Sequence, residues 1–255
     1  MPLVSLTSDY GTKDHFVGAL KGQLYHANKD IIIVDINHEI KPFDVLSGAY
    51  ILKNAAATFP AGSIHIASIN IREGNSRFLI VKRKENFFVV PDNGIICLMF
   101  PAEDFEAFAF EKLSKAFTFK ELHESLGTII QHISEDQIEA IGVKTNSYKV
   151  LNNIQAIVMP ELIRGSIFYV DGFDNVVVNI SKELFEEFVG DKQFVISFRQ
   201  HKIGNLSNHY SDVAEGEVLA LFNDAGFLEI SMNRANAAGL LGLAYGSLVM
   251  VEVFE

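Results

Sequence analysis

The sequence predicts an α/β chain of two domains: an N-terminal α/β domain with a mainly parallel sheet, and a C-terminal antiparallel β-barrel-like domain. Two observations support this. Over residues 1–145, apolar strands alternate with helices, which is the pattern of a parallel sheet covered by helices. Over residues 165–255, short strands follow one another between turn signals, as in an antiparallel barrel or sandwich. A chain of 255 residues can form both cores.

In the first predicted domain, apolar runs of strand length predict strands, and longer runs with helical spacing predict helices. The helix expected at 14–27, for example, places Phe16, Leu20 and Leu24 on one face. In chain order we expect a strand at 2–9, a helix at 14–27, a strand at 31–37, a helix at 44–59, strands at 63–70, 78–84 and 87–93, and a helix at 120–133.

Residues 146–164 have no clean period and contain Pro160, so they are predicted to be a linker. The second domain, residues 165–255, then consists of short strands separated by turn sequences such as "DGFDN" and "NDAG". The expected strands lie at 166–170, 175–180, 193–200, 217–222, 227–232 and 248–254.

The composition limits the partners. Lys and Arg total 21 against 32 Asp and Glu, a net charge of −11, which disfavours nucleic acid and anionic membranes and tolerates a cationic ligand. The single cysteine, Cys97, excludes a disulfide within the chain, and its apolar neighbours predict a core position. The chain starts without a signal-peptide pattern and has no apolar run long enough to cross a bilayer. We therefore expect a cytoplasmic protein.

Two carboxylates stand at the end of the first strand. Asp9 follows the strand at the edge where open α/β sheets bind ligands, and a carboxylate there often holds ribose hydroxyls. The alternative is a turn or N-cap role for a helix that starts near Lys13. Asp14 is equally compatible with an exposed carboxylate favoured by the helix dipole.

The segment 35–44, "DINHEIKPFD", mixes carboxylates with His38. A metal site and ordinary turn and capping roles both remain open, although one histidine among scattered acids is weak support for a metal. No HxH, HExxH, GxGxxG, P-loop or GxSxG sequence is present. No metal and no cofactor are expected. Because these generic motifs are absent, they give no indication of an activity.

The second domain contains two further candidate sequences. The stretch 171–180, "DGFDNVVVNI", places two acids, an aromatic residue and an amide in a tight turn before a strand. The stretch 233–242, "NRANAAGLLG", offers small residues at a strand-to-helix junction, where backbone amides can approach a flat ring. Each is also compatible with a plain hairpin turn or a helix start.

Taken in order, the stretches 6–22, 35–44, 91–94, 169–180 and 228–242 resemble the S-adenosyl-L-methionine (SAM) hydroxide adenosyltransferases, or SAM hydrolases, whose relatives include the SAM-dependent fluorinase and chlorinase. The resemblance implies a homotrimer with active sites between the N-terminal domain of one subunit and the C-terminal domain of its neighbour. It also implies the reaction: a nucleophile displaces methionine from the ribose 5′ carbon of SAM, and water as nucleophile gives adenosine.

The resemblance also implies which residues bind SAM. Asp9 would hold the ribose 2′ and 3′ hydroxyls, and Asp14 would face the methionine ammonium. The second domain would supply Asp171 and Asn175 for the nucleoside, the backbone of Asn236 and Ala237 over the base, and Asn223 and Asp224 for the methionine side. Two positions depart from the family: Asp224 stands where serine is frequent, and Asp174 where glycine is usual.

The departures at the catalytic positions are larger. The family activates water with an Asp, an Arg and a His. Here Asn70 replaces the Asp, Arg77 keeps its spacing, and Lys120 stands at the His position. An asparagine cannot act as a carboxylate base; Lys120 could equally be a solvated residue at a helix start, and Arg77 a surface ion pair. SAM hydrolysis, transfer to another nucleophile such as halide, and a SAM- or adenosine-binding protein without activity all remain compatible with the sequence.

Overall fold

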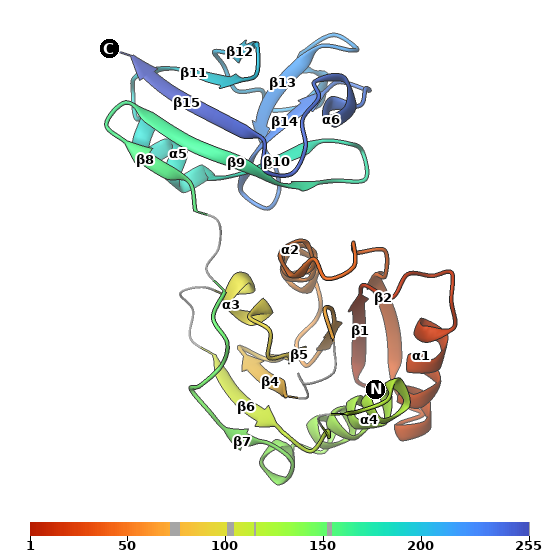
Figure 1. The fold of residues 1–255 in the computed structure, drawn as a ribbon. Coiled ribbons are helices and arrows are strands. Elements are labelled where there is room, and N and C mark those ends of the chain that lie inside the picture. Colours follow the sequence, from red (N-terminus) through yellow and green to blue (C-terminus); the bar gives the residue numbers. More distant parts are fainter. Residues whose placement is uncertain (72–76, 101–104, 115, 152–154, 255) are drawn as a thin grey trace. The chain divides into compact units, whose positions relative to one another are not determined.

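The computed structural model describes residues 1–71, 77–100, 105–114, 116–151 and 155–254. The chain divides into two compact units, Met1–Asn153 and Ile154–Glu255 (Figure 1). The second unit starts earlier than residue 165, inside the segment expected to be a linker. The reason is a hairpin: β8 (Ile157–Met159) pairs antiparallel with β9 (Leu162–Val170), and Pro160 lies in the turn between them.

The first unit is built on a seven-stranded sheet in the order β2-β1-β3-β5-β4-β6-β7. Strands β2, β1, β3 and β5 pair in parallel, but β4, β6 and β7 add antiparallel pairings, so only one half of the sheet is parallel. The chain reverses between β4 and β5 in a tight turn where Lys84 has a left-handed φ of 53°. The strands are β1 Leu3–Ser8, β2 Ile32–Asn37, β3 Ile64–Ser68, β4 Phe78–Arg83, β5 Asn86–Pro91, β6 Glu106–Phe110 and β7 Val143–Lys144.

Helices cover both faces of this sheet (Figure 1). On one face, α1 (Phe16–Ala27) and α4 (Phe119–Ser134) bury their apolar sides in one core. On the other face, α2 (Val45–Ala56) and α3 (Ile95–Met99) share a second core. Cys97 on α3 packs against this second core but is only partly buried, less than its apolar neighbours led us to expect. A short 3-10 helix at Ile138–Ala140 follows α4.

The second unit is an antiparallel, barrel-like sheet in the order β12-β11-β15-β9-β10-β14-β13, with β8 on β9. This confirms the predicted class of the C-terminal domain. The strand pattern did not reveal one helix, α5, which is capped by Ser181, whose hydroxyl accepts the Leu184 N–H. The elements are β10 Val176–Ser181, α5 Lys182–Val189, β11 Gln193–Phe198, β12 His201–Ile203, a 3-10 helix at Tyr210–Asp212, β13 Val218–Phe222, β14 Phe227–Met232, α6 Ala237–Leu240 and β15 Leu248–Phe254. Of the helices described in either unit, none is long and apolar enough to span a bilayer.

Two buried histidines in the first unit are kept neutral by their surroundings. His65 on β3 stacks on Phe88, with ring centroids 4.9 Å apart, and His123 on α4 lies beside Tyr10 and Phe119. Both are almost fully buried. Burial lowers the pKa of each imidazole from its usual 6.5 to about 4.

These histidines make the free energy of unfolding depend on pH. Between pH 6.5 and 4 the unfolded chain binds protons at these imidazoles and the folded chain does not, so stability falls as the pH drops through this window. We expect a loss of at most about 2–3 kcal/mol per histidine between pH 7 and 4.5, measurable by guanidinium unfolding. The His123→Phe variant, which keeps a ring among aromatic neighbours, should lose less; an equal loss would contradict this assignment.

Candidate functional site

Asp9 is fixed at the carboxyl ends of the parallel strands of the first unit. One of its oxygens, Oδ2, accepts the backbone N–H of Phe43 at 2.9 Å and of Asn70 at 3.0 Å. These two amides come from the segments that follow β2 and β3, so three neighbouring strands meet at this carboxylate. The capping interpretation is wrong, because α1 begins only at Phe16 and its N-cap position is His15.

A chain of hydrogen bonds that starts at the buried Ser8 and His38 lies next to Asp9. The Ser8 hydroxyl is 2.7 Å from Nδ1 of His38, and Nε2 of His38 is 3.1 Å from Oδ1 of Asp35. Asp35 also pairs with Lys21. Although burial opposes ionisation, hydrogen bonds from Lys21 and His38 hold the pKa of Asp35 below its usual range. The chain fixes the segment after β2, which supplies an amide to Asp9.

The other acids of the segment 35–44 serve turns and caps. Asp44 caps α2 by accepting the Ser47 N–H at 3.1 Å, and Glu39 accepts the Thr12 N–H at 2.8 Å. Across the described residues, no group of three or more His, Cys, Asp and Glu side chains gathers closely enough to hold a metal ion. These contacts favour the turn and capping interpretation of the segment.

Asp14 lies in the exposed segment before α1, five residues after Asp9 in the chain. It is not part of the first helical turn, because α1 has no acidic residue there. Its role toward a ligand stays a prediction.

The residues at the family's catalytic positions have separate surroundings. Asn70 has a left-handed φ of 52°, and its backbone N–H supports Asp9. Arg77 donates to Asp92 at 2.8 Å and pairs with Glu111 at 3.1 Å. The five residues before Arg77 lie outside the described part of the chain. Arg77 is thus held by two carboxylates within its own unit.

Lys120 lies in the first turn of α4, where Thr118 forms a capping box with Glu121. The Lys120 side chain is 75% exposed, and its Nζ is 3.8 Å from Glu124 one turn further along. These contacts are those of a solvated residue at a helix start, one of the two alternatives that the sequence left open. Among the described contacts, none joins Lys120 to Asn70 or Arg77.

An aromatic group beside Asp9 was not predicted from the sequence. Tyr10 contacts Phe119 edge to face, with centroids 5.5 Å apart, and lies 6.2 Å from the ring of His123. Phe16 lies 4.9 Å from Phe119. Burial raises the pKa of Tyr10 above its usual value. These rings, which come from three separate segments, form an apolar wall next to the carboxylate, and the only sequence signal was the position of Tyr10 after Asp9.

In the second unit, Asp171 organises the turn between β9 and β10. Its Oδ1 accepts the backbone N–H of Phe173 at 2.9 Å and of Asn175 at 2.8 Å, and its Oδ2 accepts the side-chain amide of Asn175 at 3.0 Å. Asp174 has a left-handed φ of 63°, which explains why glycine is the usual residue there. Aspartate tolerates this conformation better than most residues, so the turn is retained.

A cavity of about 530 Å³ brings predicted residues of this unit together. Asn236 caps α6 by accepting the Gly239 N–H, and the Ala238 N–H donates to the Asp174 carbonyl at 2.9 Å, which ties α6 to the turn. Ala237 is fully buried beside them. The cavity is lined by Phe173, Asn175, Tyr210, Met232, Asn233, Arg234, Ala235 and Asn236.

Asn223 and Asp224 form the turn between β13 and β14. Oδ1 of Asn223 accepts the N–H of Ala225 and of Phe227, both at 3.1 Å, and its Nδ2 donates to Glu229 at 3.2 Å. Asp224 is exposed. Glu229 was not predicted as a site residue, although an acid in the middle of an apolar strand was a signal.

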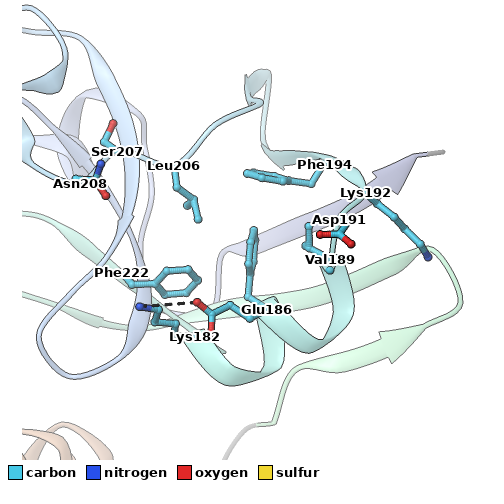
Figure 2. Close-up of a pocket in the computed structure, with 12 residues that line it drawn as sticks. Lys182, Glu186, Val189, Asp191, Lys192, Phe194, Leu206, Ser207, Asn208 and Phe222 are labelled. Atoms are coloured by element: carbon cyan, nitrogen blue, oxygen red, sulfur yellow. Dashed lines mark ion pairs between the residues drawn. The ribbon is translucent and has the colours of Figure 1, made fainter.

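A second cavity of this unit, of about 520 Å³, lies beside α5 (Figure 2). Figure 2 shows Phe194 and Phe222 along its walls, and Lys182 paired with Glu186 at 3.8 Å. It contains none of the residues that the sequence predicted. The cavity lined by Asn175 and Asn236 is therefore the candidate site of this unit.

The fold and these sites define a two-domain protein: the α/β unit holds a carboxylate at the carboxyl ends of its parallel strands, and the β-barrel-like unit has a cavity lined by Asn175 and Asn236. Family models for the SAM hydroxide adenosyltransferase N-terminal and C-terminal domains match residues 4–139 and 165–250. The chain belongs to the SAM hydroxide adenosyltransferase family.

Three relatives cover the chain almost end to end. The (R)-S-adenosyl-L-methionine hydrolase of Methanocaldococcus jannaschii is 29% identical over 96% of this chain and 94% of its own length. The fluorinase of Actinopolyspora mzabensis is 23% identical over 98% of this chain and 97% of its own. A crystal structure of an uncharacterized conserved protein from Thermotoga maritima has a TM-score of 0.84 at 27% identity and covers 98% of this chain and 99% of its own.

Proposed function

We propose that this protein hydrolyses SAM to adenosine and L-methionine by attack of water at the ribose 5′ carbon. The observation that carries the proposal is Asp9, a carboxylate held by two backbone amides at the ligand-binding edge of the sheet, in a chain of this family. Both amides bind Oδ2, which leaves Oδ1 to accept the ribose hydroxyls. The M. jannaschii relative named as a hydrolase supports the same activity.

The proposed binding roles use both units. Asp9 takes the ribose hydroxyls and Asp14 the methionine ammonium. The second unit takes the rest of the molecule: Asp171 and Asn175 contact the nucleoside, Asn236 and Ala237 cover the base, and Asn223 and Asp224 face the methionine. We propose a cytoplasmic homotrimer in which the two halves of each active site come from neighbouring subunits. Sedimentation velocity of the purified protein tests the trimer.

The chemistry requires little of the protein beyond alignment. The sulfonium of SAM is already an activated leaving group, so no acid has to protonate it. Water forms a bond to C5′, the C5′–S bond breaks with its electron pair going to sulfur, and a proton passes to solvent. Aligning water, carbon and sulfur in line can contribute roughly 7–11 kcal/mol. The apolar wall formed by Tyr10 and Phe119 would limit competing solvent.

We assign the placing of water to Arg77, Asn70 and groups near Lys120. Their surroundings also favour a second candidate, because Arg77 is paired with two carboxylates and Lys120 points to solvent. A site without a working water-activating group would bind SAM or adenosine without turnover. Transfer to halide is a third outcome, in keeping with the name of the A. mzabensis relative.

One assay separates these outcomes. The purified protein is incubated with SAM in ¹⁸O-labelled water, with and without chloride. The nucleosides are then separated, and their molecular masses are measured by mass spectrometry. Hydrolysis at C5′ predicts adenosine with solvent oxygen in its 5′ hydroxyl and an equal amount of methionine. A chlorinated nucleoside formed only with chloride would replace the proposal with halide transfer. Tight SAM binding without any product would mean that the protein binds SAM but does not turn it over.

A further inference from the structure

Glu229 is a buried acid that is hydrogen-bonded to Tyr210, a residue that lines the candidate site. It lies on β14 and is only 3% exposed. Its Oε1 accepts from the Tyr210 hydroxyl at 2.9 Å and the Ser231 hydroxyl at 2.7 Å, and its Oε2 accepts from the Asn223 amide at 3.2 Å. All these donors are neutral, and no ion pair to Glu229 occurs in the described part of the chain. Three donated hydrogen bonds match the acceptor capacity of a carboxylate.

Two of these donors belong to the proposed binding site. Tyr210 lines the cavity that also contains Asn175 and Asn236. Asn223 forms the turn assigned to the methionine side of SAM. Glu229 therefore links the nucleoside part of the site to the methionine part, and its charge lies one side chain away from both.

The surroundings of Tyr210 are acidic. Burial, the hydrogen bond to Glu229, and the nearby charges of Glu229, Asp171 and Asp224 all raise the pKa of Tyr210. A cation also lines the cavity, Arg234, but it pairs with Glu215 on the surface. Three carboxylates thus act on Tyr210, and the buried one, Glu229, is screened by salt less than an exposed one.

We propose that Glu229 is a specificity-determining residue, which makes this site prefer the sulfonium cation SAM over uncharged nucleosides. The inference rests on the proposed function and adds the source of its substrate preference. SAM carries a positive sulfonium, whereas adenosine and the thioether analogue S-adenosyl-L-homocysteine lack it. A negative charge held behind Tyr210 attracts the substrate and not the product, so it favours both capture of SAM and release of adenosine.

The test compares ligand affinities of the full chain by isothermal titration calorimetry. Glu229→Gln keeps the size of the side chain and removes its charge. We expect it to weaken SAM binding about tenfold, because the sulfonium loses the attraction of one buried charge, and to change adenosine binding by less than about twofold. Ser231→Ala, which removes one donor and keeps the charge, is the matched control and should preserve the ratio of the two affinities.

The outcomes separate this inference from the proposed function. If the wild-type protein does not bind SAM, the proposed function itself is wrong. Equal weakening of SAM and adenosine in Glu229→Gln, or no change in either, would mean that Glu229 has only a structural role or none in binding. If Glu229→Gln does not fold, the wild type still decides: equal affinities for SAM and for its thioether analogue would overturn the inference.

Discussion

Asp9→Ala should weaken SAM binding at least a hundredfold. Two ribose hydroxyls would lose a charged acceptor, and each such hydrogen bond contributes on the order of 1.5–3 kcal/mol. The substitution also removes the acceptor of the Phe43 and Asn70 amides, so the loops that form the site would lose their common anchor. Calorimetric titration with SAM measures the loss, and the melting temperature shows how much of it comes from the fold.

Asp9→Asn is the matched control for this prediction. Its side-chain oxygen can still accept the two backbone amides, but the NH₂ that replaces Oδ1 is a donor without a negative charge. We expect Asn to restore most of the stability and little of the affinity. SAM binding that is unchanged in both variants would remove Asp9 from the site and leave it a purely structural residue.

The fold class and the position of Asp9 were predictable because both follow from local pattern. A polar residue that directly follows a parallel strand lies at the carboxyl end of that strand, where open α/β sheets bind ligands, and this placement does not depend on how distant strands pair. The antiparallel half of the first sheet was not predictable in this way. Strands β6 and β7 pair with partners distant in the sequence, and β7 has only two residues. Pairing of such strands is set by the packed sheet and not by their own sequence.

In the candidate site, too, local contacts could be predicted from the sequence and contacts between distant segments could not. Asp171 and Asn175 lie in one turn, and their contact follows from the turn sequence. Glu229 and Tyr210 are 19 residues apart and meet only because the tertiary fold brings β14 against the 3-10 helix that contains Tyr210. The role of Arg77 could not be predicted, because its sequence position is compatible both with placing water and with an ion pair. The structure gives it two acidic partners, one of them nearly buried.

Arg77→Ala should lower the free energy of unfolding by about 2–3 kcal/mol. The Asp92 side chain is only 8% exposed and accepts the Arg77 guanidinium at 2.8 Å and the Lys149 N–H at 2.7 Å. Without Arg77, that carboxylate keeps one backbone donor and no cation among its described contacts. Because Arg77 also donates to Thr145 at 3.3 Å, the segment that follows β7 would lose a tie to β4 as well. Denaturant unfolding at neutral pH measures the change.

A double variant separates the structural role of Arg77 from a role in placing water, and Lys120→Ala serves as a control at an exposed ion pair. Arg77→Ala combined with Asp92→Ala should recover most of the lost stability, since no buried charge is left unpaired. Lys120→Ala, which removes an exposed side chain 3.8 Å from Glu124, should change stability by less than about 0.5 kcal/mol. If Arg77 also places water, the double variant will be stable yet slow, with a reduced turnover number and little change in SAM affinity, because an interaction made in the transition state affects the rate constant. Full turnover in the stable double variant would limit Arg77 to holding Asp92.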